Sequence, residues 1–207
     1  GKKIKTYITG ILQLSNGDII VSSSGYGVMK LKGTYGTPYG GILKNTNYVV
    51  HMLQDKHGQL WLVTEDQGLL CIKGNKIKRY FLSAEEKACI KDGDICEDKK
   101  GNIYVGTNGM GLWRLNYGAK AFQWIKPTAK MPIKDLYIDH QGNVLLGCDG
   151  IGLYVYYPNT GQLVANPFYS NDISLPKTKI QTVVEDRNGN IWLGMLQNGV
   201  SMQPAKK

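Results

Sequence analysis

Short runs of alternating apolar and polar residues, interrupted by glycine, fill the chain. In the recurring unit, an apolar run ends at Asp or Ser, a turn containing Gly follows, and a β-rich run such as Ile191–Gly194 comes next. A third run opens with Gly, as at Gly111–Leu115, and a second turn leads to a more polar run, as at Lys76–Tyr80. Glycine supplies the positive φ that tight hairpin turns need. Each unit therefore predicts four antiparallel strands.

The turn glycines give the length of the repeat. Their spacings are 41, 43, 41 and 47 residues, so about five units fill the 207 residues. Four strands in about 43 residues is the size of a β-propeller blade. A β-sandwich is the alternative, but its strands do not recur as near-identical four-strand modules. The turn glycines are Gly17, Gly58, Gly101, Gly142 and Gly189.

We therefore expect an all-β fold, a β-propeller segment of five four-stranded blades in one domain over residues 1–207. The fifth repeat ends at its third strand, while residues 2–7 resemble the outer strand at Lys76–Tyr80. Two arrangements fit this spare strand. It completes the last blade of a closed five-bladed ring, which removes two exposed edges, or the chain is a fragment of a longer propeller. The expected repeats are 8–45, 48–81, 90–125, 132–167 and 178–203.

One segment departs from the strand pattern. Ser83–Ala88 is predicted to form a helical turn between two blades, with Ser83 as its N-cap and Glu86 three residues later.

The net charge of +9 suits an acidic partner. Much of it falls on predicted outer strands, at residues 3–5 and 76–79, where lysine prevents edge-to-edge association. Because no nucleic-acid recognition motif accompanies the charge, we expect no nucleic-acid partner. The longest apolar runs, such as 147–157, are too short and too rich in glycine to span a bilayer, so no membrane-embedded segment is expected.

Neither the cysteines nor the histidines predict a reactive centre. The four cysteines lack metal-ligand spacing, so we expect no metal and no cofactor, and Cys71 and Cys148 are expected as small buried side chains. His57 and His140 fall in or beside hairpin turns. Asp66 and Asp149 are the one pair of loop carboxylates that we regard as a candidate general acid and general base acting on a glycan. We expect no enzymatic activity, and a polysaccharide lyase or hydrolase is the less favoured alternative.

Residues that repeat in every blade are expected to build the fold. Trp61, Tyr104, Leu145 and Trp192 share one strand position and predict a core between blades. The Asp before each hairpin turn is expected to accept turn N–H groups two or three residues later. These aspartates are Asp55, Asp98, Asp139 and Asp186.

Function is then expected where the blades differ, in the loops between second and third strands and in the linkers between blades. Both open on one face of a propeller. Their amide, carboxylate and aromatic groups suit the hydroxyls and apolar faces of sugars. The candidate ligand-binding residues are Tyr26, Asp66, Gln67, Asn108, Asp149, Tyr169 and Asn198.

The repeats resemble the two-component regulator propeller repeat. Its pattern is Asp-x-x-Gly-Asn-Ile/Leu-Trp-Ile/Leu-Gly-Thr, then a short loop and Gly-Leu followed by alternating aromatics. The segment 170–176 also resembles the family's linker between blades. Asp98–Leu115 and Asp186–Gly194 match closely, Asp139–Tyr156 and Asp55–Cys71 match well, and Ser15–Met29 is degenerate.

The resemblance implies a sensor function. Such repeats form the extracytoplasmic region of hybrid two-component systems of Bacteroidetes, where two seven-bladed propellers precede a β-sandwich, a membrane helix and a histidine kinase, and oligosaccharides released from glycans are detected. It implies a periplasmic, oligosaccharide-binding segment of an inner-membrane receptor that signals by phosphorelay and forms a homodimer through the parent. A protein-interaction scaffold is the alternative from another class.

Overall fold

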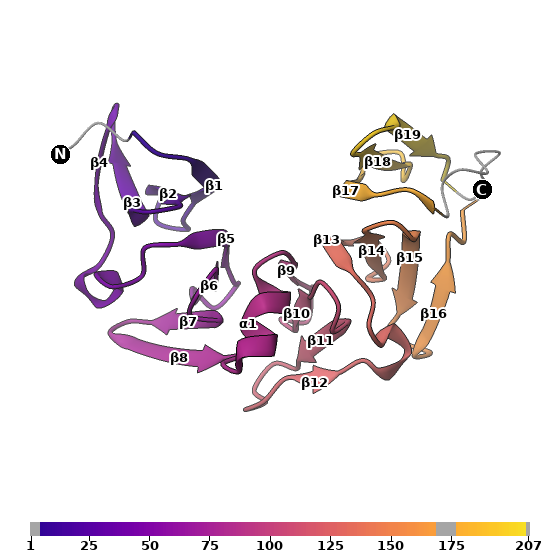
Figure 1. Ribbon diagram of the computed structural model, residues 1–207, viewed down its shortest axis with the longest axis horizontal. Coiled ribbons are helices and arrows are strands. Elements are labelled where there is room, and N and C mark those ends of the chain that lie inside the picture. Colours follow the sequence, from indigo (N-terminus) through magenta and orange to yellow (C-terminus); the bar gives the residue numbers. More distant parts are fainter. Residues whose placement is uncertain (1–4, 169–176, 206–207) are drawn as a thin grey trace. The chain divides into compact units, whose positions relative to one another are not determined.

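The computed structural model describes residues 5–168 and 177–205. Within them the chain forms five antiparallel sheets, the blades of a β-propeller fold, as predicted (Figure 1). Each expected repeat contains one sheet. The chain divides into two compact units, residues 1–92 with blades 1 and 2 and residues 93–207 with blades 3 to 5.

The first unit holds two four-stranded blades in which neighbours in sequence are neighbours in the sheet. Of the spare outer strand expected at 2–7, the structure describes 5–7, and these residues lie outside the strands. They lead into the first blade, where the Tyr7 carbonyl accepts the Ser24 N–H at 3.1 Å. The strands are β1 (Ile8–Gln13), β2 (Ile19–Ser23), β3 (Gly27–Lys32) and β4 (Tyr35–Pro38), then β5 (Val49–Gln54), β6 (Leu60–Thr64), β7 (Leu69–Lys73) and β8 (Lys76–Tyr80).

The second unit holds two four-stranded blades and one of three described strands, which agrees with the expected lack of a fourth strand in the last repeat. The strands are β9 (Asp94–Glu97), β10 (Ile103–Gly106), β11 (Leu112–Leu115) and β12 (Gln123–Trp124), then β13 (Ile133–Ile138), β14 (Val144–Cys148), β15 (Gly152–Tyr157) and β16 (Gln162–Ala165), and finally β17 (Ile180–Glu185), β18 (Ile191–Met195) and β19 (Gly199–Gln203).

Three short helical segments connect blades. The helix α1 (Ala84–Ile90) begins after Ser83, whose hydroxyl accepts the Glu86 N–H at 3.2 Å, while the Glu86 carboxylate accepts the Ser83 N–H at 2.9 Å. This capping box confirms the predicted helix, which is seven residues long and buries Ile90. Two 3-10 helices, η1 (Gly41–Leu43) and η2 (Lys126–Thr128), lie in linkers.

Within each unit, neighbouring blades pack through their first two strands. In the first unit β1 and β2 contact β5, and in the second β9 and β10 contact β13 while β13 and β14 contact β17. Aliphatic residues of facing sheets fill the space between them, among them Ile20 and Leu62 in the first unit and Leu146 and Ile180 in the second. Burial of this apolar surface holds the blades together.

The repeated aromatic position lies in this core for three of its four members. Trp61, Tyr104 and Leu145 are at most 2% exposed, as predicted. For Trp192 the prediction is wrong, because its side chain is 40% exposed and the neighbouring Val184 and Met202 are exposed as well. Within the second unit, no described sheet packs on this face of β18. Cys71 and Cys148 are buried, and burial raises their thiol pKa values to about 11 and about 12.

The repeated Asp closes each hairpin turn, as expected, but with a different spacing. One carboxylate oxygen accepts the backbone N–H groups two and four residues later, at 2.8–3.0 Å in all four turns. The second oxygen accepts a side-chain amide four residues later and, from Trp61 and Trp192, an indole N–H at 2.9 Å. Hydrogen bonds from Trp192 and Asn190 lower the pKa of Asp186 to about 2.

Candidate functional site

The predicted ligand-binding residues lie at the end of each blade where the linkers enter, which we call the linker face. In the first unit, Tyr26 and Asp66 are exposed, and Gln67 is partly buried. The Gln67 side-chain amide donates to the Asn45 carbonyl at 2.8 Å, and the Gly25 N–H, beside Tyr26, donates to the Asn47 carbonyl at 2.8 Å. One linker therefore holds the loops of both blades.

The second unit repeats this arrangement. Asn108 pairs with Pro132 in a β-bridge, and the Asp149 N–H donates to the Pro132 carbonyl at 2.8 Å. Both side chains are exposed. The Asn198 side-chain amide reaches the Thr178 hydroxyl of the next linker at 3.5 Å. Tyr169 lies outside the described residues.

The structure thus brings the loops of Tyr26, Asp66 and Gln67 together on one linker and those of Asn108 and Asp149 on another, whereas Asn198 contacts its linker without a second predicted residue. Exposed Tyr26, Asp66, Asn108 and Asp149 leave their side chains available to a ligand, whereas the amides of Gln67 and Asn198 also anchor their loops. A hydroxyl clamps three of these loops. Ser23, Thr64 and Thr107 each donate to the glycine carbonyl four residues later and accept an N–H three residues later.

A pair of carboxylates near the linker face was not predicted. Asp94 begins β9 and Asp135 lies in β13, and their side chains share a hydrogen bond. Each carboxylate also accepts an N–H of the next blade, from Leu136 at 3.0 Å and from Val183 at 2.7 Å. Burial raises the pKa of Asp94, although the hydrogen bonds and Lys134 oppose the rise. Two carboxylates in such contact hold a proton more tightly than either would alone.

We expect Asp94→Asn to stabilise the chain at neutral pH. Since the folded-state pKa of Asp94 lies above its unfolded value, protonation favours the folded state, and the resulting stability is lost as pH rises through the folded pKa. Asparagine keeps an acceptor for the Leu136 N–H and a donor for Asp135 without this loss, and it gives up only the bond from the adjacent Ile95 N–H.

Melting temperatures measured from pH 3 to 8 check this expectation. The gain should be present at pH 7 and disappear near pH 3. The exposed Asp92→Asn is the matched control and should show no such trend. An Asp94→Asn curve parallel to that of the unchanged chain at all pH values would contradict the assignment.

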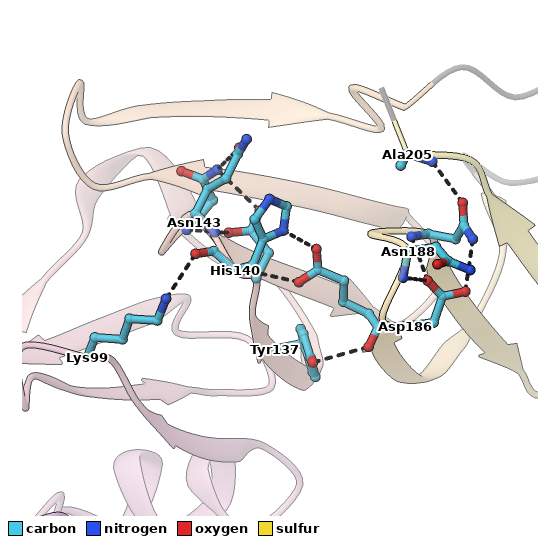
Figure 2. Close-up of polar contacts among 11 residues, drawn as sticks. Lys99, Tyr137, His140, Asn143, Asp186, Asn188 and Ala205 are labelled. Carbon is cyan, nitrogen blue, oxygen red and sulfur yellow. Dashed lines mark hydrogen bonds and ion pairs between the residues drawn. The ribbon is translucent and has the colours of Figure 1, made fainter. Parts of the chain in front are cut away.

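Two clefts open at the opposite end of the blades in the second unit, the hairpin face. One, of about 410 Å³, lies between the hairpin turns of blades 4 and 5. Figure 2 shows its polar contacts, with His140 facing the last blade. The lining residues are Tyr137, His140, Glu185, Asp186, Arg187, Asn188 and Gly189.

His140 is held from both sides. Its ring Nδ1 contacts the Glu185 carboxylate, and its backbone N–H donates to the same carboxylate at 2.7 Å. From blade 3, the Lys99 ammonium donates to the His140 carbonyl at 3.1 Å (Figure 2). The sequence placed His140 correctly in a hairpin turn, but its Glu185 partner, 45 residues away, was missed. The contact orients the imidazole beside the cleft.

A second cleft, of about 290 Å³, lies between the hairpin turns of blades 3 and 4. Tyr104 and Arg114 line it from the sheet, and Lys99, Lys100 and His140 line it from the turns. Neither cleft suggests a metal centre, because no group of three His, Cys, Asp or Glu within the described residues is arranged to hold an ion. None of the helices in these parts of the chain is long and apolar enough to cross a membrane.

These blades define a β-propeller, and the sequence assigns its repeats to a family. Residues 43–66, 90–109 and 174–197 match the model of the two component regulator propeller. Three segments of the chain therefore match the model of this repeat, which confirms the resemblance seen in the sequence. No curated protein sequence matches the chain.

Solved structures share the fold at low sequence identity. The extracellular domain of a putative one component system from B. thetaiotaomicron is 19% identical, with a TM-score of 0.76 over 100% of this chain and 28% of that one. That of a putative hybrid two component system from the same organism is 17% identical, with a TM-score of 0.73 over 98% and 28%. Virginiamycin B lyase from Staphylococcus aureus is 14% identical, with a TM-score of 0.70 over 98% and 71%. The chain spans less than a third of the first two.

Proposed function

We propose that the chain is a ligand-sensing, extracytoplasmic propeller segment of a hybrid two-component sensor histidine kinase in the inner membrane. The match of three repeats to the two component regulator propeller carries the proposal. The fold it shares with extracellular domains of one- and two-component systems supports a periplasmic location. In this proposal the segment binds its ligand, and the parent kinase performs the phosphorelay.

The proposed ligand is an oligosaccharide at the linker face. Exposed Asp66, Asn108 and Asp149 offer hydrogen-bonding groups to sugar hydroxyls, and exposed Tyr26 offers an aromatic surface to an apolar sugar face. Gln67 and Asn198 would bind while anchored to linkers, and Tyr169 stays in the proposal as a sequence-based candidate. Tyr26, Asp66 and Asn108 lie on loops that a hydroxyl clamps, so little ordering cost accompanies their binding.

Signalling requires that the ligand discriminate between two states of the receptor. A ligand shifts an equilibrium only by its differential affinity for the two states. Because the linkers at residues 45–47 and at Pro132 each hold loops of two blades, a ligand that bridges such loops favours one arrangement of neighbouring blades. The proposed readout is a change in how the segment sits against the rest of the receptor or its homodimer partner.

Calorimetry against a panel of neutral and acidic oligosaccharides tests the proposal. For a glycan that binds, we expect Tyr26→Ala, Asp66→Ala and Asn108→Ala each to weaken affinity about tenfold, as loss of a central contact does. Asn75→Ala is the matched control for Asn108→Ala, because Asn75 is exposed in the β7–β8 turn at the hairpin face. Equal affinity in the three variants would exclude the linker face, and no binding by any glycan would contradict the sensor proposal for this segment.

A lyase is the second candidate function. The His140–Glu185 contact beside a cleft is an arrangement in which a carboxylate orients a general base, and virginiamycin B lyase shares the fold. Product analysis of the calorimetry samples separates the two candidates, since catalysis consumes the glycan and binding leaves it intact.

A further inference from the structure

One position in the core between blades carries a cation where its equivalents are apolar. The third-strand residue paired with the repeated aromatic position is Cys71 in β7 and Val155 in β15, both buried. In β11 it is Arg114, paired with Tyr104 and partly buried. Because burying a guanidinium costs more than burying an apolar side chain, packing of the blades does not account for Arg114.

Only some of the N–H groups of the Arg114 guanidinium have a hydrogen-bond partner among the described residues. It shares a hydrogen bond with the Tyr104 hydroxyl, which opposes the rise that burial causes in the pKa of Tyr104. Its Nε is buried and has no hydrogen-bond partner among the residues that the structure describes. A buried N–H donor without an acceptor is costly, so an acceptor that reached this side of the guanidinium would remove that cost.

The space beside Arg114 is cationic and poor in acceptors. The cleft of about 290 Å³ is lined by Lys99, Lys100 and Arg114, and Asp98 is the one carboxylate among the residues described as lining it. The Asp98 carboxylate already accepts the N–H groups of Lys100 and Asn102 and the Asn102 side-chain amide, at 2.8–2.9 Å. An oxyanion entering the cleft therefore meets more positive than negative charge, beside an Arg114 Nε–H that has no described acceptor.

We propose that this cleft binds a carboxylate or sulfate group of a small acidic ligand, such as an acidic saccharide, with Arg114 as its anchor. The Nε edge of a guanidinium, with the adjacent terminal N–H, forms the two parallel bonds that carboxylates and sulfates accept. Lys99 and Lys100 lie at the exposed rim, and the side-chain amides of Gln141 and Asn159 line the cleft. The site is on the hairpin face, so it does not rest on the proposed oligosaccharide site.

Titration of the full chain with sodium sulfate and with sodium glucuronate, at constant ionic strength, tests the assignment. The ¹H–¹⁵N signal of the Arg114 Nε–H should shift saturably and report the Kd. Arg114→Met should weaken binding at least tenfold, because it removes the charged anchor. Arg114→Lys keeps the charge but cannot form two parallel hydrogen bonds. Its Kd should therefore lie between those of the unchanged chain and Arg114→Met. For the variants, backbone amide signals of the Asp98–Asn102 turn report binding.

Lys126→Met is the matched control, since Lys126 is exposed, carries the same charge and does not line the cleft. It should leave the Kd unchanged within twofold. Binding of sulfate alone assigns the site to sulfate esters, and binding of glucuronate alone assigns it to uronates. Shifts that do not saturate, or equal Kd values for Arg114→Met and the unchanged chain, would overturn the proposal.

Loss of folding does not confound the result. Methionine is apolar, as are the buried residues at the equivalent positions, and circular dichroism of Arg114→Met should match that of the unchanged chain. If Arg114→Met does not fold, Lys100→Ala provides the test, because Lys100 is exposed and its removal should weaken binding about threefold. An unchanged Kd in Lys100→Ala would then count against the site.

Discussion

Gly111→Ala is expected to destabilise the second unit by about 3–5 kcal/mol, which combines backbone strain with a steric clash. Gly111 opens β11 with φ of +74°, and a Cβ there would lie 2.2 Å from the Thr128 carbonyl oxygen and 2.6 Å from its hydroxyl. The Thr128 hydroxyl also accepts the Leu112 N–H at 2.7 Å, so it cannot withdraw without breaking a buried bond. Urea denaturation followed by circular dichroism measures the loss.

Gly118→Ala separates the two causes. Gly118 has φ of +81° in the same unit, but a Cβ there meets nothing within 4 Å. Gly118→Ala should therefore lower the free energy of unfolding only by the cost of backbone strain, about 1 kcal/mol. Equal losses at the two positions would mean that the contact with Thr128 does not fix the loop.

The second large effect is expected from Asp55→Ala, which should cost about 2–4 kcal/mol because it leaves buried donors without an acceptor. The Asp55 carboxylate is buried and accepts two turn N–H groups, the Gln59 side-chain amide and the Trp61 indole N–H. Trp61 is 2% exposed, so water cannot replace the lost bond. Thermal unfolding followed by circular dichroism gives the change in the free energy of unfolding.

Asp139→Ala is the matched control in an equivalent turn. Asp139 accepts the same two N–H groups and the Asn143 amide, but Leu145 stands where Trp61 does. The N–H groups that Asp139 accepts are partly exposed, so water can replace the carboxylate. Asp139→Ala should therefore lower the free energy of unfolding by about 1 kcal/mol. A cost for Asp139→Ala as large as that for Asp55→Ala would show that the turn, not the indole bond, determines stability.

The blades could be predicted because their determinants are local and repeat. Each Asp, turn glycine and β-rich run lies within about ten residues, and Asp98–Leu115 alone contains a hairpin turn and two strands. Exposure of Trp192 could not be predicted, because it depends on whether another sheet covers the last blade. The same pattern that buries Trp61 leaves Trp192 at the surface.

The carboxylate pair and the anion cleft escaped prediction for a related reason. Asp94 meets Asp135, and His140 meets Glu185, across more than forty residues, and one sequence gives no signal for such contacts. In the sequence, Arg114 is indistinguishable from any polar residue of a strand in which apolar and polar residues alternate. Only the register, which sets it beside Tyr104 in the core between blades, makes it unusual. The linker-face residues were found because loop composition marks them, and their role stays a prediction.

The shared linkers have a consequence for how such proteins exchange repeats. Pro132 supports the loops of Asn108 and Asp149, which belong to different blades, so a crossover placed in that linker separates one of these loops from its support. A crossover in the turn at Gly101 leaves both supports intact, because Asn108, Pro132 and Asp149 then come from the same parent, whereas a crossover in the turn at Gly142 separates Asp149 from Pro132. Chimeras of related propellers joined in the turn at Gly101 should therefore keep both loops held by Pro132, whereas those joined at Gly142 should lose the support of the Asp149 loop.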